Sequence, residues 1–425
     1  MSANTLALFG GTPAFNSTVE IFNTIGDEEI AAVTKVMKTG VLSKYIGAPG
    51  SDFMGGPKVR EMEEKFAEYF SVKHAIAVNS WTSGLIAAVG AIGIEPGDEV
   101  ILSPWTMSAC AMAILHWNAI PVFADITERD FCIDPLEVRK QITDKTRAIM
   151  VIDIFGQSVN MEKYREIADE FNLKIISDSA QSPGAKYNGK YAGTLADIGG
   201  ISLNYHKHIH SGEGGVLFTN NDELARKLSL IRNHAESVIT KTEANEFTNM
   251  IGYNFRLGEI EAAIALEQIK KLENIVSLKE TLANELTVEL SGLKGVKLPD
   301  KSEDSRNVFY VYPIIINTDE LEVDRSRILE ALRAEGVPGL VEGYQNLHLL
   351  PVFQNLKAFG SSGWPWSKTN ADHYSYDMGT LPVAEKLHSK SFIGLGITGL
   401  DFSSHQIRLI GAAFTKVWAN LEMLK

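Results

Sequence analysis

The stretch Ser202-Leu-Asn-Tyr-His-Lys207-His-Ile-His-Ser-Gly212-Glu-Gly-Gly215 sets one lysine among histidines. Lys207 stands five residues after a serine and five before a Gly-Glu-Gly-Gly turn. A neutral lysine amine can attack an aldehyde, and burial or a nearby cation lowers its pKa enough for that chemistry. Most lysines are solvated surface charges. Lys207 therefore becomes a catalytic candidate only if suitable partners occur elsewhere in the chain.

The size and composition describe an ordinary globular protein. The chain has 425 residues, 45% of them hydrophobic, and a formal net charge of -13, which argues against nucleic acid or an anionic membrane as the main partner. The two cysteines, Cys110 and Cys132, lack metal-ligand spacing and suggest buried thiols in a reducing compartment. The first residues do not resemble a signal peptide, and no apolar run is long enough to span a membrane. We therefore expect a cytoplasmic protein.

Apolar runs and helical stretches alternate from about residue 58. This alternation predicts an α/β fold with a mainly parallel (mixed) sheet flanked by helices. Helical spacing occurs, for example, in residues 106–117 and 161–171. The predicted strands cover residues 74–78, 99–102, 121–125, 148–154, 174–177 and 198–203. Sheets of this kind bind ligands at the carboxyl ends of their strands.

The pattern changes near residue 257. A long helix is expected over residues 258–293, a strand over 308–316, and helices over 324–335 and 404–424. We therefore predict a large domain over residues 1–275 and a smaller C-terminal α+β domain over 276–425. The N-terminal segment is a candidate to pack on the small domain.

Three segments place polar side chains at the ends of predicted strands or the starts of predicted helices. Asp178 ends a predicted strand, where its carboxylate could keep a pyridine nitrogen protonated, as pyridoxal phosphate requires, or simply cap a helix. Gln181 follows three residues later and could reach the ring hydroxyl. Thr82 lies at a predicted helix start, which suits a phosphate but is equally typical of an ordinary cap. Asn254 precedes the long helix and could cap it or reach a ligand.

Together these segments resemble the DegT/DnrJ/EryC1/StrS sugar aminotransferases, which have the type I fold of pyridoxal-phosphate transferases. The similarity covers nearly the whole chain and is densest between residues 58 and 275. It rests on the order of five motifs: Ser80-x-Thr82, Pro104-Trp-Thr106, Asp178-x-Ala-Gln181, Ser202-x4-Lys207-x4-Gly-Glu-Gly-Gly and Asn254-x-Arg256.

The resemblance implies a role for each matching position. Lys207 would form the Schiff base with pyridoxal 5'-phosphate and later move the proton. Asp178 would hold the pyridine nitrogen, and Gln181 the ring oxygen. The cofactor phosphate would be bound by the backbone of Trp81, by Thr82 and Ser202, and by Asn254 of a neighbouring subunit, since this family shares its active site across a homodimer.

Two positions depart from the family pattern. Met107 stands where an aromatic residue usually stacks on the pyridine ring, so either Met107 covers the cofactor through its sulfur or Trp105 supplies the ring. Trp81 occupies a turn position that is commonly glycine. Its side chain must point away from the phosphate if only its backbone binds there.

Several polar residues remain substrate candidates. His206 and His208 flank Lys207 and could line the pocket or pack structurally; a metal site is not expected, because no acidic or cysteine ligands accompany them. His348 lies in a segment that resembles an acceptor-sugar region, although a structural histidine is equally consistent. Arg256 could bind a donor carboxylate or form a surface ion pair.

The expected activity is transfer of an amino group from an amino acid, L-glutamate by the resemblance, to a keto or aldehyde sugar of deoxyamino-sugar or lipopolysaccharide biosynthesis. The variant around Lys207 is similar to a branch that aminates 8-oxo-3-deoxy-manno-octulosonate. Two alternatives stay open: a pyridoxamine-phosphate sugar 3-dehydratase, whose relatives replace the lysine with histidine, and a non-catalytic cofactor-binding regulator.

Overall fold

The computed structural model describes residues 5–300, 304–369 and 374–425. Within these residues the main sheet has seven strands in the order β2-β10-β9-β6-β5-β3-β4. They are β2 (His74–Val78), β3 (Glu99–Leu102), β4 (Ile120–Phe123), β5 (Thr146–Ile152), β6 (Lys174–Asp178), β9 (Ile198–Ser202) and β10 (Gly215–Thr219). Five of them, β4, β3, β5, β6 and β9, run parallel, while β10 is antiparallel to both its neighbours. The predicted α/β class is confirmed.

Each strand predicted in the first two hundred residues forms, with ends shifted by two residues or fewer. The strand β10 was not predicted, since its five residues directly follow the glycine turn. It completes the sheet by joining β2 to β9. The strand interiors are almost wholly buried, as expected for a sheet covered by helices on both faces.

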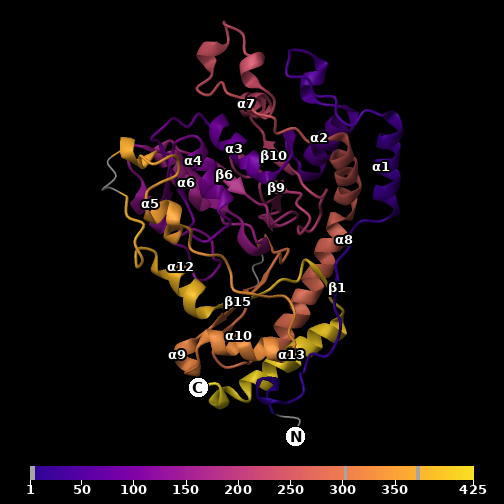
Figure 1. Ribbon diagram of the computed structural model, residues 1–425, viewed down its shortest axis with the longest axis vertical. Coiled ribbons are helices and arrows are strands. Elements are labelled where there is room, and N and C mark those ends of the chain that lie inside the picture. Colours follow the sequence, from indigo (N-terminus) through magenta and orange to yellow (C-terminus); the bar gives the residue numbers. More distant parts are fainter. Residues whose placement is uncertain (1–4, 301–303, 370–373) are drawn as a thin grey trace.

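Helices cover the sheet on both sides (Figure 1). The helix α2 shows why these segments are helical: Pro57 occupies its first turn, and Val59, Met62, Phe66 and Phe70 form one buried stripe. The helices that precede residue 259 are α1 (Asp27–Thr39), α2 (Pro57–Phe70), α3 (Trp81–Ala91), α4 (Ala109–His116), α5 (Pro135–Gln141), α6 (Met161–Phe171) and α7 (Asp222–Arg232).

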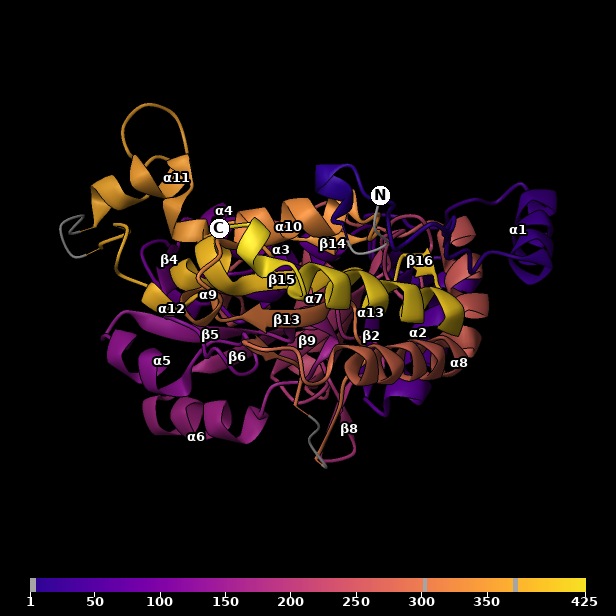
Figure 2. The same cartoon turned by 90° about the horizontal axis from the view of Figure 1, so that it is seen from below.

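The long helix α8 (Glu259–Leu290) connects the two parts of the molecule (Figures 1 and 2). Its first half packs with α2, and its end contributes Leu282, Leu286 and Leu290 to a second core. That core also contains a small antiparallel sheet in the order β11-β13-β15-β14. Its strands are β11 (Val296–Lys297), β13 (Tyr312–Ile316), β14 (Leu340–Val341) and β15 (Phe392–Leu395). The helices of this part are α9 (Thr318–Leu321), α10 (Arg325–Ala334) and α13 (Ser404–Trp418).

Segments from the chain's two ends cross between these cores. Leu6 and Phe15 lie in the small-domain core, and the short strand β1 (Glu20–Ile21) pairs with β16 (Leu400–Asp401). In the other direction, α11 (Pro351–Gln354) and α12 (Pro382–Lys386) supply side chains to the large-domain core. A division of the chain at residue 275 falls inside α8 and remains a prediction.

Three further short strands, β7 (Lys186–Tyr187), β8 (Lys190–Tyr191) and β12 (Ser305–Arg306), form a separate small sheet. Among the helices of the described residues, none combines the length and the apolar character that a membrane crossing requires.

Candidate active site

Lys207 lies in the turn that follows β9, and its ammonium nitrogen sits 4.4 Å from the centre of the Tyr310 ring. Burial lowers the pKa of Lys207 to about 8, although the nearby Asp178 and Cys110 act in the opposite direction. An amine with this pKa is neutral in a useful fraction of molecules near neutral pH, which a nucleophile for an aldehyde requires.

Asp178 is the last residue of β6, at the carboxyl end of the sheet, and its carboxylate is buried. The indole of Trp81 donates to Oδ1 of Asp178 at 2.7 Å, and the thiol of Cys110 donates to Oδ2 at 3.0 Å. The side chain of Trp81 therefore points into the molecule and away from the start of its helix. This satisfies the condition for a phosphate to approach the Trp81 backbone.

The start of α3 is the expected phosphate site. Ser80 caps this helix, since its Oγ accepts the Ser83 backbone N–H at 3.1 Å, and the side chain of Thr82 is exposed. The N–H groups of Trp81 and Thr82 come before the first carbonyl-bonded turn, so no carbonyl within the helix can accept them. Ser202 pairs with Gly215, where an added methyl group would come within 2.9 Å of the Trp81 backbone. The helix start and Ser202 are thus brought together, as an anion site needs.

Two tyrosines from beyond residue 300 reach the same region, and neither was named as a site residue from the sequence. The hydroxyl of Tyr344 accepts the Gln181 side-chain amide at 2.8 Å, while the Gln181 oxygen accepts the Phe155 backbone N–H at 2.8 Å. Tyr310 lies under Lys207, and burial raises the pKa of its phenol to about 12, so the phenol keeps its proton. No local motif marks Tyr310. Tyr344 begins the segment that resembles an acceptor-sugar region, but its contact with Gln181 depends on how distant segments meet.

Of the two residues proposed to cover the cofactor ring, only Met107 presents much surface, with 52% of it exposed. Trp105 has none exposed and packs edge-on against the rings of Phe155 and Phe392. Its indole donates to the Tyr344 carbonyl. Trp105 thus supports the segment that carries Tyr344, and Met107 remains the candidate to cover the ring.

The histidines around Lys207 point to different places. His208 is fully buried, with Nε2 2.8 Å from the Val308 carbonyl oxygen, and burial lowers its pKa to about 4. His206 lies near the Tyr310 ring, and desolvation followed by the charge of Lys207 lowers its pKa to about 4. Both are therefore neutral at pH 7. Within the described ranges no three metal-ligating side chains converge.

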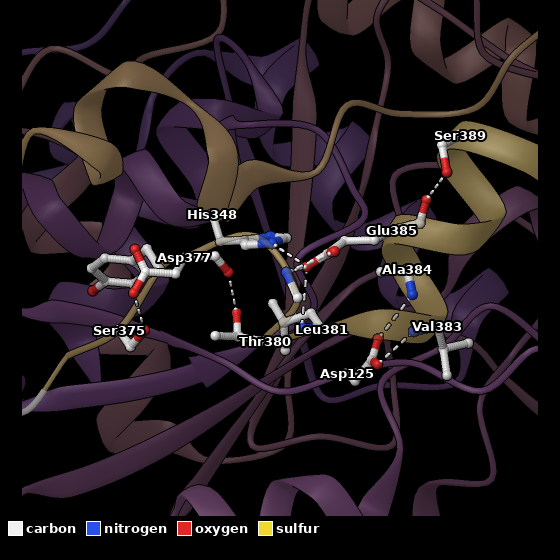
Figure 3. A network of polar contacts seen from close by, with 12 residues as sticks. Asp125, His348, Ser375, Asp377, Thr380, Leu381, Val383, Ala384, Glu385 and Ser389 are labelled. Atoms are coloured by element: carbon white, nitrogen blue, oxygen red, sulfur yellow. Dashed lines mark hydrogen bonds and ion pairs between the residues drawn. The ribbon is translucent and has the colours of Figure 1, made fainter.

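His348 belongs to a separate polar network (Figure 3). Its imidazole is fully buried, and Nε2 lies 3.0 Å from Oε1 of Glu385 in α12. Asp125 caps the same helix by accepting the backbone N–H groups of Val383 and Ala384 at 2.8 and 3.0 Å. These contacts hold α12 against two segments, the one after β14 that carries His348 and the one after β4 that carries Asp125. They give His348 a structural partner, and no contact in the described parts joins it to Lys207.

Asn254 and Arg256 lie beside the beginning of α3. The carbonyl of Asn254 accepts the Asn79 side chain at 3.4 Å, and the Asn254 side chain is exposed. Arg256 donates to the Asn233 side chain at 2.9 Å. Asn254 is thus open to a second molecule, whereas Arg256 is at least partly occupied within its own chain.

The fold and this site together fit one class of protein, the type I pyridoxal-phosphate enzymes. The model of the DegT/DnrJ/EryC1/StrS aminotransferase family matches residues 23–393. The chain belongs to this family and is an aminotransferase with pyridoxal phosphate as its cofactor.

Individual relatives agree with the family assignment. The spore coat polysaccharide biosynthesis protein SpsC of Bacillus subtilis is 32% identical over 84% of this chain and 90% of its own. GDP-perosamine synthase of Caulobacter vibrioides is 33% identical over 71% of this chain and 80% of its own. Among solved structures, an aminotransferase from Psychrobacter cryohalolentis superposes with a TM-score of 0.80, at 26% identity, over 95% of this chain and all of that one.

The residues present fit this cofactor. Lys207 would supply an amine of lowered pKa for the aldehyde, and Asp178 a buried carboxylate for the ring nitrogen. The first N–H groups of α3 would be available to the phosphate, because no carbonyl within the helix can accept them. All three lie at the carboxyl ends of β2, β6 and β9, where ligands bind in such sheets.

Proposed function

We propose that this aminotransferase moves an amino group from an amino acid, L-glutamate, to the keto or aldehyde group of a sugar. The observation that carries the proposal is the position of Lys207 at the carboxyl end of the sheet, 4.4 Å from the Tyr310 ring and near the buried carboxylate of Asp178, where burial lowers its pKa. A named relative, GDP-perosamine synthase, points to a nucleotide-linked amino sugar as the product class. Cytoplasmic location and formation of a homodimer remain predictions.

In this proposal the cofactor supplies an electron sink when it is bound. Lys207 moves the proton from the donor's α-carbon, since an amine with a pKa of about 8 can both accept and release a proton near neutral pH. Asp178 holds the ring nitrogen protonated. Gln181 faces the ring oxygen, with Tyr344 fixing the orientation of its amide.

The acceptor would enter beside Tyr310, which lies against Lys207, and beside the adjoining rings of His206 and Tyr205. Aromatic faces and polar tips of this kind suit a sugar ring. His206 is neutral and can accept a hydrogen bond from a sugar hydroxyl. The acceptor 8-oxo-3-deoxy-manno-octulosonate is one specific proposal, alongside nucleotide-linked keto sugars.

An absorbance experiment tests the reaction type. We expect the purified protein with pyridoxal phosphate to show a visible band that L-glutamate bleaches and that Lys207→Ala abolishes. Absence of the band in the wild-type protein would refute the proposal. A band that no amino acid converts would favour the regulator alternative, and a carbonyl sugar released without nitrogen would favour the dehydratase.

The acceptor is identified by a panel of keto and aldehyde sugars that includes 8-oxo-3-deoxy-manno-octulosonate, with the amine product detected by mass. L-Glutamine is tested beside L-glutamate as donor. If none of the carbonyl sugars gains nitrogen from the aminated cofactor, the sugar part of the proposal fails while the aminotransferase assignment stands.

The shared site is tested at Asn254. In the proposed homodimer its exposed side chain reaches the phosphate bound by the partner, so Asn254→Ala should raise the cofactor dissociation constant severalfold. Asn245→Ala changes another exposed asparagine of the preceding loop and serves as the control. Equal cofactor affinity in the two variants, or a monomer in sedimentation, would remove Asn254 from the site.

A further inference from the structure

The indole of Trp81 links the two ends of the cofactor site. Trp81 is the first residue of α3, yet its side chain is only 6% exposed, and its N–H reaches Asp178 at the end of β6 at 2.7 Å. The chain makes room for this ring: a methyl group at Gly84 or Gly200 would come within 2.9 or 2.5 Å of it. The inward position of Trp81 is therefore specified by the residues around it.

The two oxygens of Asp178 are not equally occupied. Oδ1 accepts both the Trp81 indole at 2.7 Å and the Ala180 backbone N–H at 3.0 Å. Oδ2 accepts the Cys110 thiol at 3.0 Å and no second donor from the described residues, and a thiol is a weak donor. A carboxylate oxygen can accept about two hydrogen bonds, so Oδ1 is filled while Oδ2 retains capacity for a stronger donor.

We propose that Trp81 is a positioning residue that fixes Asp178 so that Oδ2 is the oxygen offered to the ring nitrogen of the cofactor. This inference rests on the proposed function, which gives Asp178 that role. The same hydrogen bond couples the start of α3, where the phosphate binds, to the strand end that binds the ring. Cys110 shields Oδ2 without competing strongly for it.

The matched test compares Trp81→Phe with Trp117→Phe. Both tryptophans are buried in the large-domain core, and each indole makes one hydrogen bond, that of Trp117 going to the Ile86 carbonyl at 2.8 Å. Either substitution keeps an aromatic ring and removes the N–H. Cofactor affinity is measured by titration of the cofactor-free protein, and the absorbance of the bound cofactor is followed against pH.

We expect Trp81→Phe to raise the cofactor dissociation constant about tenfold, and Trp117→Phe to leave it within twofold. In Trp81→Phe the absorbance midpoint should also move to higher pH. A ring nitrogen that holds its proton less firmly carries less positive charge on average. It therefore lowers the pKa of the nitrogen that joins Lys207 to the cofactor by a smaller amount. Thermal unfolding of the cofactor-free variants separates general damage from this effect.

Equal affinity and equal midpoints in Trp81→Phe and Trp117→Phe would overturn the inference. If wild-type protein forms no absorbing complex, the proposed function fails instead. Should Trp81→Phe not fold, Cys110→Ser provides the second test, because a hydroxyl is a stronger donor that competes at Oδ2 and should also raise the midpoint. Cys132→Ser is its control, as that buried thiol lies 3.4 Å from the Asp130 carbonyl. An unchanged midpoint in Cys110→Ser would contradict the assignment of Oδ2.

Discussion

The reactivity of Lys207 in the cofactor-free protein is the most direct test of the site. A pKa of about 8 leaves roughly one amine in ten neutral at pH 7, whereas the ordinary value of 10.5 leaves roughly one in three thousand. We therefore expect Lys207 to react with formaldehyde and a borohydride about 300-fold faster at pH 7 than an amine of ordinary pKa and equal access would. The midpoint of its pH profile should lie near 8.

The assay is reductive methylation over a pH series, with Lys207 and the exposed Lys241 quantified in separate peptides by mass spectrometry. Asp178→Asn should move the Lys207 midpoint below 8, because Asp178 is the largest influence that raises this pKa. Formaldehyde has no pyridine ring, so the change reports charge and not cofactor binding. A midpoint near 10.5, or an upward shift in Asp178→Asn, would refute the reasoning.

The same pKa has a consequence for stability. Between pH 8 and 10.5 the unfolded chain still binds a proton on Lys207 that the folded chain has lost. The unfolded state thus binds more protons in this window, so this lysine's contribution to the free energy of unfolding increases as the pH rises. In urea titrations at pH 7.5, Lys207→Met should have a larger free energy of unfolding than the wild type. This difference should be smaller at pH 9.5.

Three other substitutions have defined outcomes. Tyr310→Leu removes the ring beneath Lys207, and with it an interaction worth about 1 kcal/mol, so kcat should fall severalfold. Tyr310→Phe keeps the ring and should keep this interaction. Glu385→Ala removes the hydrogen-bond partner of His348 and of the Gly379 and Leu381 backbone N–H groups. It should lower the free energy of unfolding by about 2–4 kcal/mol and leave the KM for the sugar substrate unchanged. Gly200→Ala would place a methyl 2.1 Å from a carbonyl oxygen of the neighbouring strand, so little folded protein is expected on purification.

Each of these has an outcome that contradicts it. Equal kcat in Tyr310→Leu and Tyr310→Phe would show that the ring is not needed. A raised acceptor KM in Glu385→Ala would return His348 to the substrate site. Gly399→Ala adds its methyl group to open space and is the control for Gly200→Ala. Similar amounts of the two purified proteins would mean that the sheet can shift to accommodate a methyl group at Gly200.

The sequence predicted the strands and helices whose apolar spacing is local, such as β3, α6 and α8. It did not predict β10, because Gly215–Thr219 is short and antiparallel and follows a turn. The two-residue strand β1 has no local signal either, since it is defined only by its pairing with β16 near the other end of the chain.

The site was predictable where chemistry lies next to a strand end, as at Lys207 and Asp178. Side-chain direction was not. The sequence required the Trp81 side chain to turn away only if the Trp81 backbone binds the phosphate. The hydrogen bond of its indole to Asp178 depends on a strand almost a hundred residues later. The contributions of Tyr310, Tyr344 and Cys110 likewise depend on how distant segments meet, and the burial of Trp105 depends on Phe392 from β15.

The second core unites segments that lie far apart in the sequence. Leu6 and Phe15 share it with Leu329 and Phe414, and the Phe15 N–H donates to the Glu335 carbonyl at 3.0 Å. Such contacts require the chain to close a very long loop, whereas neighbouring strands of the main sheet such as β3 and β5 need a much shorter one. The second core should therefore be completed late in folding, after these distant segments have met.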